Sequence, residues 1–180
     1  MPEFKSLNNK LRFQGKITSV YESDFRAPNG EQITREITRH PGAVCVVPII
    51  ASDIVMIRQF RPAIGNYLLE IPAGKRDIDG EPPDVTARRE LQEEVGLSTN
   101  NLVELAQFYN SPGFCDEYSY CYLALDCEDV TDDRQGLEEE YMTIEAVPIS
   151  QASTLVTSGK IIDGKTIIGI SLALQYLNAR

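Results

Sequence analysis

The apolar residues of this 180-residue chain gather in short runs separated by turn signals. Two near-continuous runs, "GAVCVVPII" at 42–50 and "DIVMIRQF" at 53–60, predict a buried hairpin, and "YLLEIPAG" at 67–74 predicts a short strand after it. Further strands are predicted in three later segments: "NLVELAQFY" at 101–109, "YSYCYLALD" at 118–126 and "MTIEAVPI" at 142–149.

Three segments predict helices. In the first of them, Pro82 and Pro83 fit a helix start, where the missing N–H of proline is harmless. Gly96 can adopt the left-handed conformation that ends a helix. The apolar positions between these ends step by four residues along one face: Ala87, Leu91 and Val95. Two closing helices are predicted at 150–159 and 165–180.

Residues 11–40 alternate in polarity but carry little core material. "FQGKITSVY" at 13–21 and "EQITREITR" at 31–39 predict two strands joined by the turn signal "APNG". Such a hairpin packs against something else in the molecule or in a second copy. Strands mixed with helices on more than one side predict an α/β fold, an α/β/α sandwich around a mixed sheet. The expected domains are an N-terminal β-hairpin at 1–40 and a larger domain at 41–180.

The length suits one domain with a real core, and the composition, 42% hydrophobic and 24% charged, is ordinary for a globular protein. The formal net charge of −10 repels nucleic acid and anionic membranes, so neither is an expected partner. An anionic substrate therefore requires local arginines or metal ions. No apolar run approaches the roughly 20 residues that span a bilayer, and the polar start "MPEFKSLNNK" is not a signal peptide.

The four cysteines, Cys45, Cys115, Cys121 and Cys127, show no CxxC spacing. Because His40 is the only histidine, a Cys/His zinc site is disfavoured. Buried free thiols are the favoured interpretation, and they predict a reducing, cytoplasmic location.

One predicted helix carries three carboxylates on one side: Glu90, Glu93 and Glu94. Like charges at this spacing repel on a helix surface. One interpretation is a solvated acidic stripe. The other is a site for a hard cation such as Mg²⁺, because a repulsion of about 4 kcal/mol between two charges about 4 Å apart becomes attraction when a cation binds. The preceding glycine-rich loop and a second acidic cluster at 138–140 favour the cation site.

The pattern resembles the signature of the Nudix hydrolases: Gly, five residues, Glu, seven residues, then Arg-Glu-apolar-x-Glu-Glu-x-Gly-apolar. The matching residues are Gly74, Glu81, Arg89, Glu90, Leu91, Glu93, Glu94, Gly96 and Leu97. The first gap holds six residues in place of five, and the extra residue lies in the loop, away from the helical face. The resemblance implies that residues 41–180 form a Nudix hydrolase domain.

Two flanking segments resemble the ADP-ribose pyrophosphatase branch of this family: "IRQFRPAIGNYLLEIPAG" at 57–74 and "SPGFCDE" at 111–117. Pro112 also lies 15 residues after Leu97 (112 − 97), at a spacing typical of that branch. The resemblance implies Mg²⁺-dependent hydrolysis of the diphosphate bond of ADP-ribose to AMP and ribose 5-phosphate. It further implies two or three Mg²⁺ or Mn²⁺ ions per site.

The family pattern assigns roles to the signature residues. Glu90 and Glu94 are the expected main metal ligands, together with the backbone carbonyl of Ala73. Glu93 assists them. Arg89 is expected to form salt bridges within the signature and to orient a ligand.

The branch also implies a general base from the loop before the last strand. Glu138, Glu139 and Glu140 are all candidates, and Glu139 is favoured because it lies in the middle of the cluster. Some family members place the acid in another register, where this chain has Met142. A methionine cannot serve as a base, so the register stays open. The alternative is a merely solvated loop.

Arginines contact the substrate in the resembled branch at the positions of Arg35 and Arg61. Glu117 is a candidate acceptor for the ribose hydroxyls. The alternatives are a surface strand residue for Arg61 and a plain loop carboxylate for Glu117. The adenine is expected to stack on the N-terminal hairpin, where Tyr21 and Phe25 are candidates.

A homodimer is a further implication of the branch, because its N-terminal strands pack on a partner subunit and help to build that subunit's site. Arg35 would then serve the substrate of the other subunit. Two alternative functions stay open: a pyrophosphatase for another nucleoside diphosphate-linked substrate, and a module that binds ADP-ribose without cleaving it. The second is disfavoured, because such modules typically lose signature glutamates and this chain keeps them all.

Overall fold

The computed structural model describes residues 1–131 and 140–179. They fall into two compact units, and each is described by itself. The first unit comprises residues 1–42 with 109–118, and the second comprises residues 43–108 with 119–180. The first unit therefore takes in a loop from far along the chain in addition to the N-terminal strands.

An antiparallel sheet forms most of the first unit. Within the described residues its order is β1-β2-β3, with the bounds β1 (Lys5–Gln14), β2 (Ser19–Arg26) and β3 (Gln32–Arg39). The predicted hairpin is present as β2 and β3. Its turn is closed by hydrogen bonds from Gly30 N to Ala27 O (2.9 Å) and from Ala27 N to Glu31 O (2.8 Å). Gly30 has a φ of +92°, which glycine adopts without steric cost.

The first strand of that hairpin lies later in the chain than the polarity pattern indicates. The chain reverses between Gly15 and Thr18, where Gly15 N donates to Thr18 O at 2.8 Å. The predicted strand at 13–21 is therefore divided between the end of β1 and the start of β2. The polarity pattern missed β1 itself, because all ten of its residues are exposed and no buried face marks them.

A loop between two later strands completes the first unit. Thr38 N donates to Phe114 O (2.7 Å) and Asp116 N donates to Thr38 O (3.1 Å), so the end of β3 forms a parallel bridge with Cys115. Arg39 adds an ion pair to Asp116 at 2.9 Å. Contacts between segments this far apart in the chain leave no local pattern in the sequence.

The second unit is built on a mixed sheet. Among the described residues the order is β12-β5-β4-β10-β9, with β6 paired to β5 and β7 paired to β4. β4 and β10 are parallel, whereas β5 is antiparallel to β4, β6 and β12. The bounds are β4 (Ala43–Ile50), β5 (Asp53–Arg61), β6 (Asn66–Glu70), β7 (Ala73–Lys75), β9 (Asn101–Tyr109), β10 (Tyr118–Leu125) and β12 (Thr143–Pro148). A separate short ladder joins β8 (Leu97–Ser98) to β11 (Glu128–Asp129).

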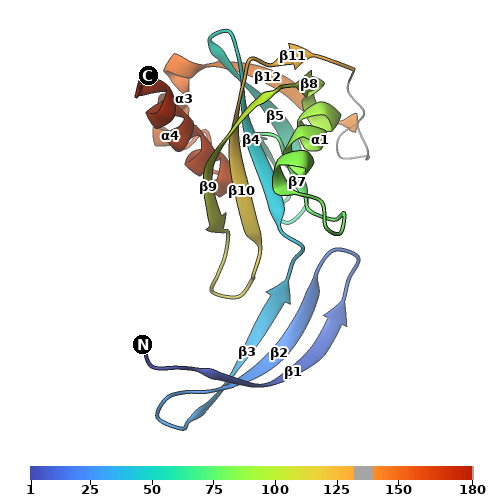
Figure 1. The fold of residues 1–180 in the computed structure, drawn as a ribbon, viewed down its shortest axis with the longest axis vertical. Helices are drawn as coiled ribbons and strands as arrows, with labels where there is room; N and C mark the ends of the chain where they lie inside the picture. The colour runs from blue at the N-terminus through green and yellow to red at the C-terminus, as the bar shows by residue number, and fades with distance from the viewer. Residues whose placement is uncertain (132–139, 180) are drawn as a thin grey trace. The chain divides into compact units, whose positions relative to one another are not determined.

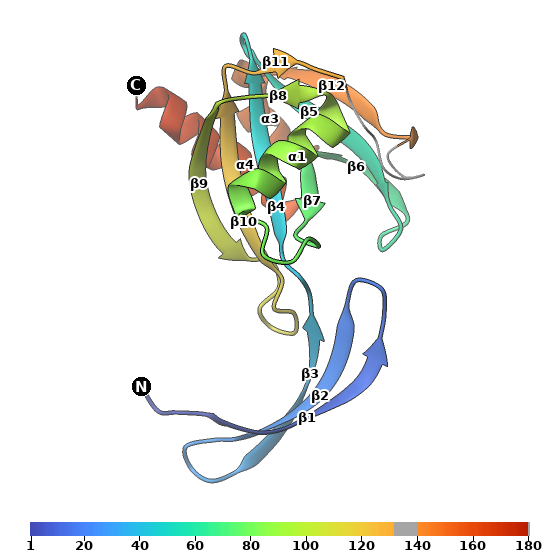
Figure 2. The same cartoon turned by 45° about the vertical axis from the view of Figure 1, so that its right-hand side comes forward.

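Helices cover both faces of this sheet. α1 (Pro83–Val95) lies on one face, and α3 (Ile149–Thr157) and α4 (Gly164–Asn178) lie on the other (Figures 1 and 2). A cluster of buried apolar side chains fills each interface. The predicted α/β/α sandwich with a mixed sheet is therefore confirmed. In the part of the chain that the structure describes, no helix combines the length and the hydropathy needed to cross a membrane.

The central strand β4 explains why the apolar run at 42–50 is nearly continuous. Successive side chains of a strand point to opposite faces of the sheet. Val44 and Val46 join the apolar cluster that contains α1, whereas Cys45 and Val47 join the cluster beneath α3 and α4. Both faces are covered, so no position on this strand is left for a polar residue.

All four cysteines lie in the described residues and are free thiols. Cys45 and Cys121 are register partners on β4 and β10, and both are buried, which confirms the prediction of buried thiols for this pair. Cys115 and Cys127 are partly buried. The hydrogen bond with Cys121 and then burial raise the pKa of Cys45 well above its ordinary value, so this thiol stays protonated and unreactive.

Candidate active site

The acidic helix begins and ends where the sequence predicts. α1 starts at Pro83, after an extended Pro82 with φ −61° and ψ 144°. It ends at Gly96, which has a φ of +63° and donates its N–H to Gln92 O at 3.0 Å. Three residues bury the predicted apolar face against the sheet: Ala87, Leu91 and Val95.

The carboxylates of α1 do not form a solvated stripe. Glu90 is 9% exposed and Glu94 is 3% exposed, while Glu93 is partly exposed. A buried carboxylate is costly unless it is paired with a charge, a hydrogen-bond donor or a metal ion. The interpretation of this helix as a solvated acidic stripe is therefore wrong. The chemistry of the site depends on the groups that face each carboxylate.

The glycine-rich loop provides one wall of the site. β7 passes so close to α1 that a Cβ built on Gly74 would overlap the Glu90 carboxylate. Only glycine fits at this position. Next to it, Ala73 N donates to Glu94 Oε2 at 2.8 Å. The loop and the helix are thus joined at the two buried carboxylates, through the N–H of Ala73 rather than through its carbonyl.

Arg89 connects the remaining charges of the signature. Its Nη1 lies 2.9 Å from Glu90 Oε1 and 2.9 Å from Glu93 Oε2, and its Nη2 lies 3.4 Å from Glu81 Oε2. Asp77 is a more distant fourth carboxylate at 3.8 Å. Glu81 therefore stays within reach of Arg89 even though the signature loop is one residue longer than the family pattern.

Glu90 is the carboxylate most affected by its surroundings. Burial raises its pKa to about 7 from 4.5; the Arg89 charge opposes this shift and the Glu93 charge adds to it. The metal-free side chain is therefore only partly ionised at neutral pH. A cation placed beside it would favour the ionised form.

The donor set fits a hard cation. Among the described residues, no three His, Cys, Asp or Glu side chains converge as a preformed metal cluster. Glu90 and Glu94 nevertheless offer two buried carboxylates behind a loop too tight for a side chain. Mg²⁺ typically takes one or two carboxylates and completes its octahedron with water and substrate phosphates. Ala73, Glu90 and Glu94 are the residues that would hold it.

A second group of charges, at the ends of β5, β6 and α4, was not predicted from the sequence. Glu70 is fully buried, and Arg61 Nε and Nη2 donate to its two oxygens at 2.7 and 2.6 Å. Lys165 also binds Glu70 and lies 2.9 Å from Asp163. The hydrogen bond to Glu70 raises the pKa of Arg61 against the effect of burial, and the charge of Glu94 contributes. The one sequence signal was a lone acid in the apolar run "LLEI".

The other predicted substrate residues lie in the first unit. Arg35 is exposed on β3, where its Nη1 donates to a neighbouring backbone carbonyl at 2.8 Å. Glu117 is partly buried, with its Oε1 3.9 Å from His40 Nδ1. The aromatic candidates Tyr21 and Phe25 are partly buried on β2.

The predicted general base falls outside the described residues. Glu138 and Glu139 both lie in the segment 132–139, of which nothing structural is described. Glu140, the third candidate, is exposed. Met142, at the alternative register, is 3% exposed and belongs to the apolar cluster that contains α1. Its role is in the core.

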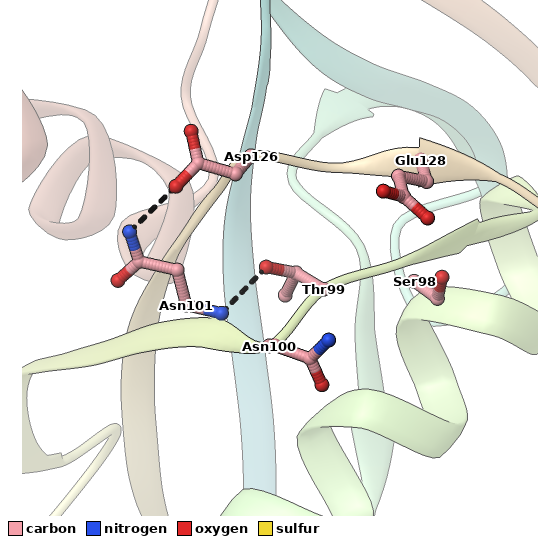
Figure 3. A pocket seen from close by; sticks show the side chains of 6 residues that line it. All are labelled: Ser98, Thr99, Asn100, Asn101, Asp126 and Glu128. Carbon is pink, nitrogen blue, oxygen red and sulfur yellow. Dashed lines mark hydrogen bonds between the residues drawn. The ribbon is translucent and has the colours of Figure 1, made fainter.

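An open pocket of about 210 Å³ lies at the β8–β9 and β10–β11 connections, and Figure 3 shows its lining. Asn101 points toward Asp126, and Asn101 Nδ2 donates to Asp126 Oδ2 at 2.8 Å. Asn101 N also donates to Thr99 Oγ1 at 2.9 Å. The lining, all of it in described residues, contains the carboxylates Asp126 and Glu128 and no basic side chain. This pocket therefore does not suit an anionic diphosphate.

Comparison with protein-family models gives a match to the NUDIX domain over residues 39–167, which is more than half of the chain. The ADP-ribose pyrophosphatase of Bacillus subtilis (strain 168) is 37% identical over 179 residues, covering 99% of this chain and 94% of that protein. A methanol dehydrogenase activator of Bacillus methanolicus is 37% identical over 177 residues, covering 97% of this chain and 92% of that protein.

The fold has a solved counterpart. A crystal structure described as an ADP compounds hydrolase matches with a TM-score of 0.85 and 23% sequence identity. The match covers 99% of this chain and 95% of the other. At this identity the likeness supports the architecture, namely the mixed sheet between two helical layers.

Proposed function

The chain belongs to the Nudix hydrolase family, and we propose that it hydrolyses the diphosphate bond of ADP-ribose to AMP and ribose 5-phosphate. The observation that carries the proposal is the pair of buried carboxylates, Glu90 and Glu94, held against the Gly74 loop. The name of the Bacillus subtilis relative supports the choice of substrate. The chain keeps every glutamate of the signature, which favours cleavage over binding alone.

In this proposal some residues bind metal ions and Arg89 orients the carboxylates. When bound, Mg²⁺ or Mn²⁺ ions neutralise the diphosphate oxygens, lower the pKa of water and stabilise the leaving oxygen. Glu90, Glu94 and the Ala73 carbonyl would hold these ions. Arg89 fixes the direction of Glu90 and Glu93 through its 2.9 Å ion pairs. Each carboxylate is thereby prepositioned, so little reorganisation remains when the substrate binds.

Basic side chains bind the substrate in this proposal. Arg61 binds a phosphate through its planar fork, and Arg35 does the same for the substrate of the other subunit. Glu117 accepts hydrogen bonds from ribose hydroxyls, and Tyr21 or Phe25 stacks on the adenine.

Glu139 is proposed as the general base that accepts a proton from the attacking water. Glu139→Gln should lower kcat by about 10² or more, the scale of general-base loss, with little change in KM. Glu138→Gln and Glu140→Gln are the matched controls, since each removes one charge from the same cluster. Near-normal turnover in Glu139→Gln together with a collapse in either neighbour would move the assignment to that neighbour.

A homodimer in a reducing, cytoplasmic compartment completes the proposal. The four free thiols support the compartment. The exposed apolar side chains of the N-terminal strand β1 support association with a second copy: Leu7 is 42%, Leu11 is 48% and Phe13 is 61% exposed.

One experiment tests the activity. The protein is incubated with Mg²⁺ and separately with ADP-ribose, ADP-sugars, NADH, diadenosine polyphosphates and nucleoside triphosphates, and the products are separated by chromatography. AMP and ribose 5-phosphate from ADP-ribose at the highest kcat/KM is the expected result, and Glu94→Gln should abolish it. A higher kcat/KM for another compound identifies the alternative, a pyrophosphatase for a different nucleoside diphosphate-linked substrate. Tight binding of ADP-ribose without products identifies a binding module.

A further inference from the structure

Glu70 lies in an unusual position for an acid. Its side chain is fully buried at the end of β6, three residues before Ala73 of the proposed metal site. Two cations approach it, Arg61 from β5 and Lys165 from the first turn of α4. A buried carboxylate of this kind seldom adds net stability, because removing it from water costs about as much as its ion pairs return. Stability alone therefore does not account for this network.

The geometry of the Arg61 fork indicates such a role. Nε and Nη2 donate to Glu70 Oε1 and Oε2 at 2.7 and 2.6 Å, which is a bidentate pair through one edge of the guanidinium. Among the described residues, Nη1 donates no hydrogen bond. The side chain of Arg61 keeps 36% exposure, whereas that of Glu70 has none. Glu70 thus fixes one edge of the fork inside the protein, and the other edge, Nη1 with the second Nη2 hydrogen, has no partner among the described residues.

The net charge of this group shows whether it attracts a phosphate or orients the donors that bind it. The group contains two cations, Arg61 and Lys165, and two carboxylates, Glu70 and Asp163, which lie within 2.9 Å of their partners. Their formal charges sum to zero, so the group as a whole adds little attraction for an anion at long range. The group instead presents two N–H donors in a fixed direction to a phosphate. The charge of Glu94 also acts on Arg61.

We propose that Glu70 is a positioning residue, which holds the inner edge of the Arg61 fork so that the outer edge presents two parallel N–H donors to a phosphate of the substrate. The inference rests on the proposed hydrolysis of ADP-ribose and adds Glu70 to its machinery. Glu70 does not touch the substrate and acts through Arg61. Lys165 and Asp163 hold Glu70 from the other side and connect it to the start of α4.

Glu70→Gln is the first test. The amide has the shape of the carboxylate but turns an N–H toward the guanidinium, so the bidentate pair is lost. KM for ADP-ribose should rise about tenfold or more while kcat changes less, because a charge-assisted contact made in both ground and transition states is lost. The Kd of a methylene-bridged ADP-ribose analogue, measured by calorimetry with Mg²⁺, should rise by a similar factor.

A fall in KM for Glu70→Gln would show that Glu70 only neutralises charge. If Glu70 only neutralises the two cations, Glu70→Gln leaves an uncompensated positive charge beside the site. KM and the Kd of the analogue would then fall, because a diphosphate is attracted more strongly. A fall, or no change, overturns the proposal.

A double-mutant cycle tests whether Glu70 acts through Arg61. Arg61→Ala alone should raise KM at least as much as Glu70→Gln. The double variant should match Arg61→Ala, because an absent fork cannot be misdirected. Effects on KM that multiply in the double variant would show two independent contributions and contradict the positioning role.

Two further variants separate a loss of positioning from a general loss of structure. Glu70→Asp keeps the charge but shortens the reach, so it should fold and raise KM by an intermediate factor; an unchanged KM in this variant also overturns the proposal. Glu145→Gln is the matched control. It breaks a similar bidentate pair to Arg58, at 2.6 and 3.1 Å, on the same strand β5, and should leave KM within about twofold.

Different outcomes refute the proposed hydrolysis of ADP-ribose and the proposed role of Glu70. A wild-type protein that neither cleaves ADP-ribose nor binds the analogue refutes the proposed function. A wild-type protein that does both, while Glu70→Gln and Glu70→Asp retain its KM and Kd, refutes only the role of Glu70.

Discussion

At the scale of single residues, the site depends on placing like charges together inside the protein. Glu90 and Glu94 are buried, and Arg89 alone contacts four carboxylates within 4 Å. The single guanidinium does not cancel the effect of burial on Glu90, whose pKa stays at about 7. The metal-free fold is therefore under electrostatic strain that a bound cation would relieve. The dependence of stability on pH and on metal should both show this strain.

The stability of the metal-free protein should fall as the pH rises from about 4.5 to about 7. The folded state binds the Glu90 proton more tightly than the unfolded chain, so below 4.5 the group costs nothing and above 7 the full cost applies. That cost is about 3 kcal/mol. Differential scanning calorimetry of Glu90→Gln, which cannot titrate, should show a flatter dependence of Tm on pH over this window.

Mg²⁺ should raise Tm more at pH 8 than at pH 5, because the carboxylates must be ionised to bind it. An equal increase at both pH values would contradict the assignment of Glu90 as a ligand.

Gly74→Ala should lower kcat/KM for ADP-ribose by about a hundredfold, since the added methyl overlaps the Glu90 carboxylate and displaces it by about 1 Å or more. Gly164→Ala is the control: a Cβ at that position would meet no atom within 4 Å, and its φ is not in the left-handed region. Equal kinetics of the two variants would show that the close approach of loop and helix is not required.

At the scale of elements, local patterns predicted most of the second unit. The helix α1 was predicted from the prolines at its start, Gly96 at its end and the apolar residues at every fourth position between them. The strands β4 and β5 were predicted from near-continuous apolar runs. The carboxylates of the site follow directly from that helix. The Glu70 network could not be predicted, because Arg61 and Lys165 come from elements more than a hundred residues apart, joined only by tertiary folding.

Gly169 tests the packing of α4 on the sheet. A Cβ at this position would lie 2.8 Å from Ile71 Cδ1 and 3.1 Å from Val47 Cγ2. Gly169→Val should lower the free energy of unfolding by about 1–3 kcal/mol through overpacking. Gly169→Ala should be nearly neutral, because a gain in helix propensity of about 1 kcal/mol offsets a small shift of Ile71. Urea unfolding measures both, and a fully stable Gly169→Val would show that the contact is loose.

At the scale of the whole molecule, the first unit is the part that the sequence described least well. The strand β1 carries apolar residues that stay exposed, and residues 109–118 join the first unit through Thr38 rather than through any local pattern. An alternation of apolar and polar residues marks a strand with one buried face. A strand that is exposed on both faces in the single chain therefore lacks this pattern. Its exposed apolar residues make sense if a second copy covers them.

Sedimentation of the full chain at micromolar concentration should therefore give a dimer of 40.2 kDa, twice the 20.1 kDa of the chain. Leu11→Asp, which places a charge at a 48% exposed apolar position on β1, should shift the mass toward that of the monomer. Lys10→Asp is the control, because it changes charge on the same strand without removing an apolar side chain. A monomeric wild type would contradict the dimer.

Residues 109–118 leave the second unit and return to it. The polypeptide passes between the two units at three points, after residues 42, 108 and 118, so a single cut cannot release the N-terminal strands as a detachable module. After cleavage between 42 and 43, the hydrogen bonds of Thr38 to Phe114 and Asp116 still tie the severed piece to the rest. Limited proteolysis at that peptide bond should leave a nicked protein that co-elutes as one species until denaturant is added.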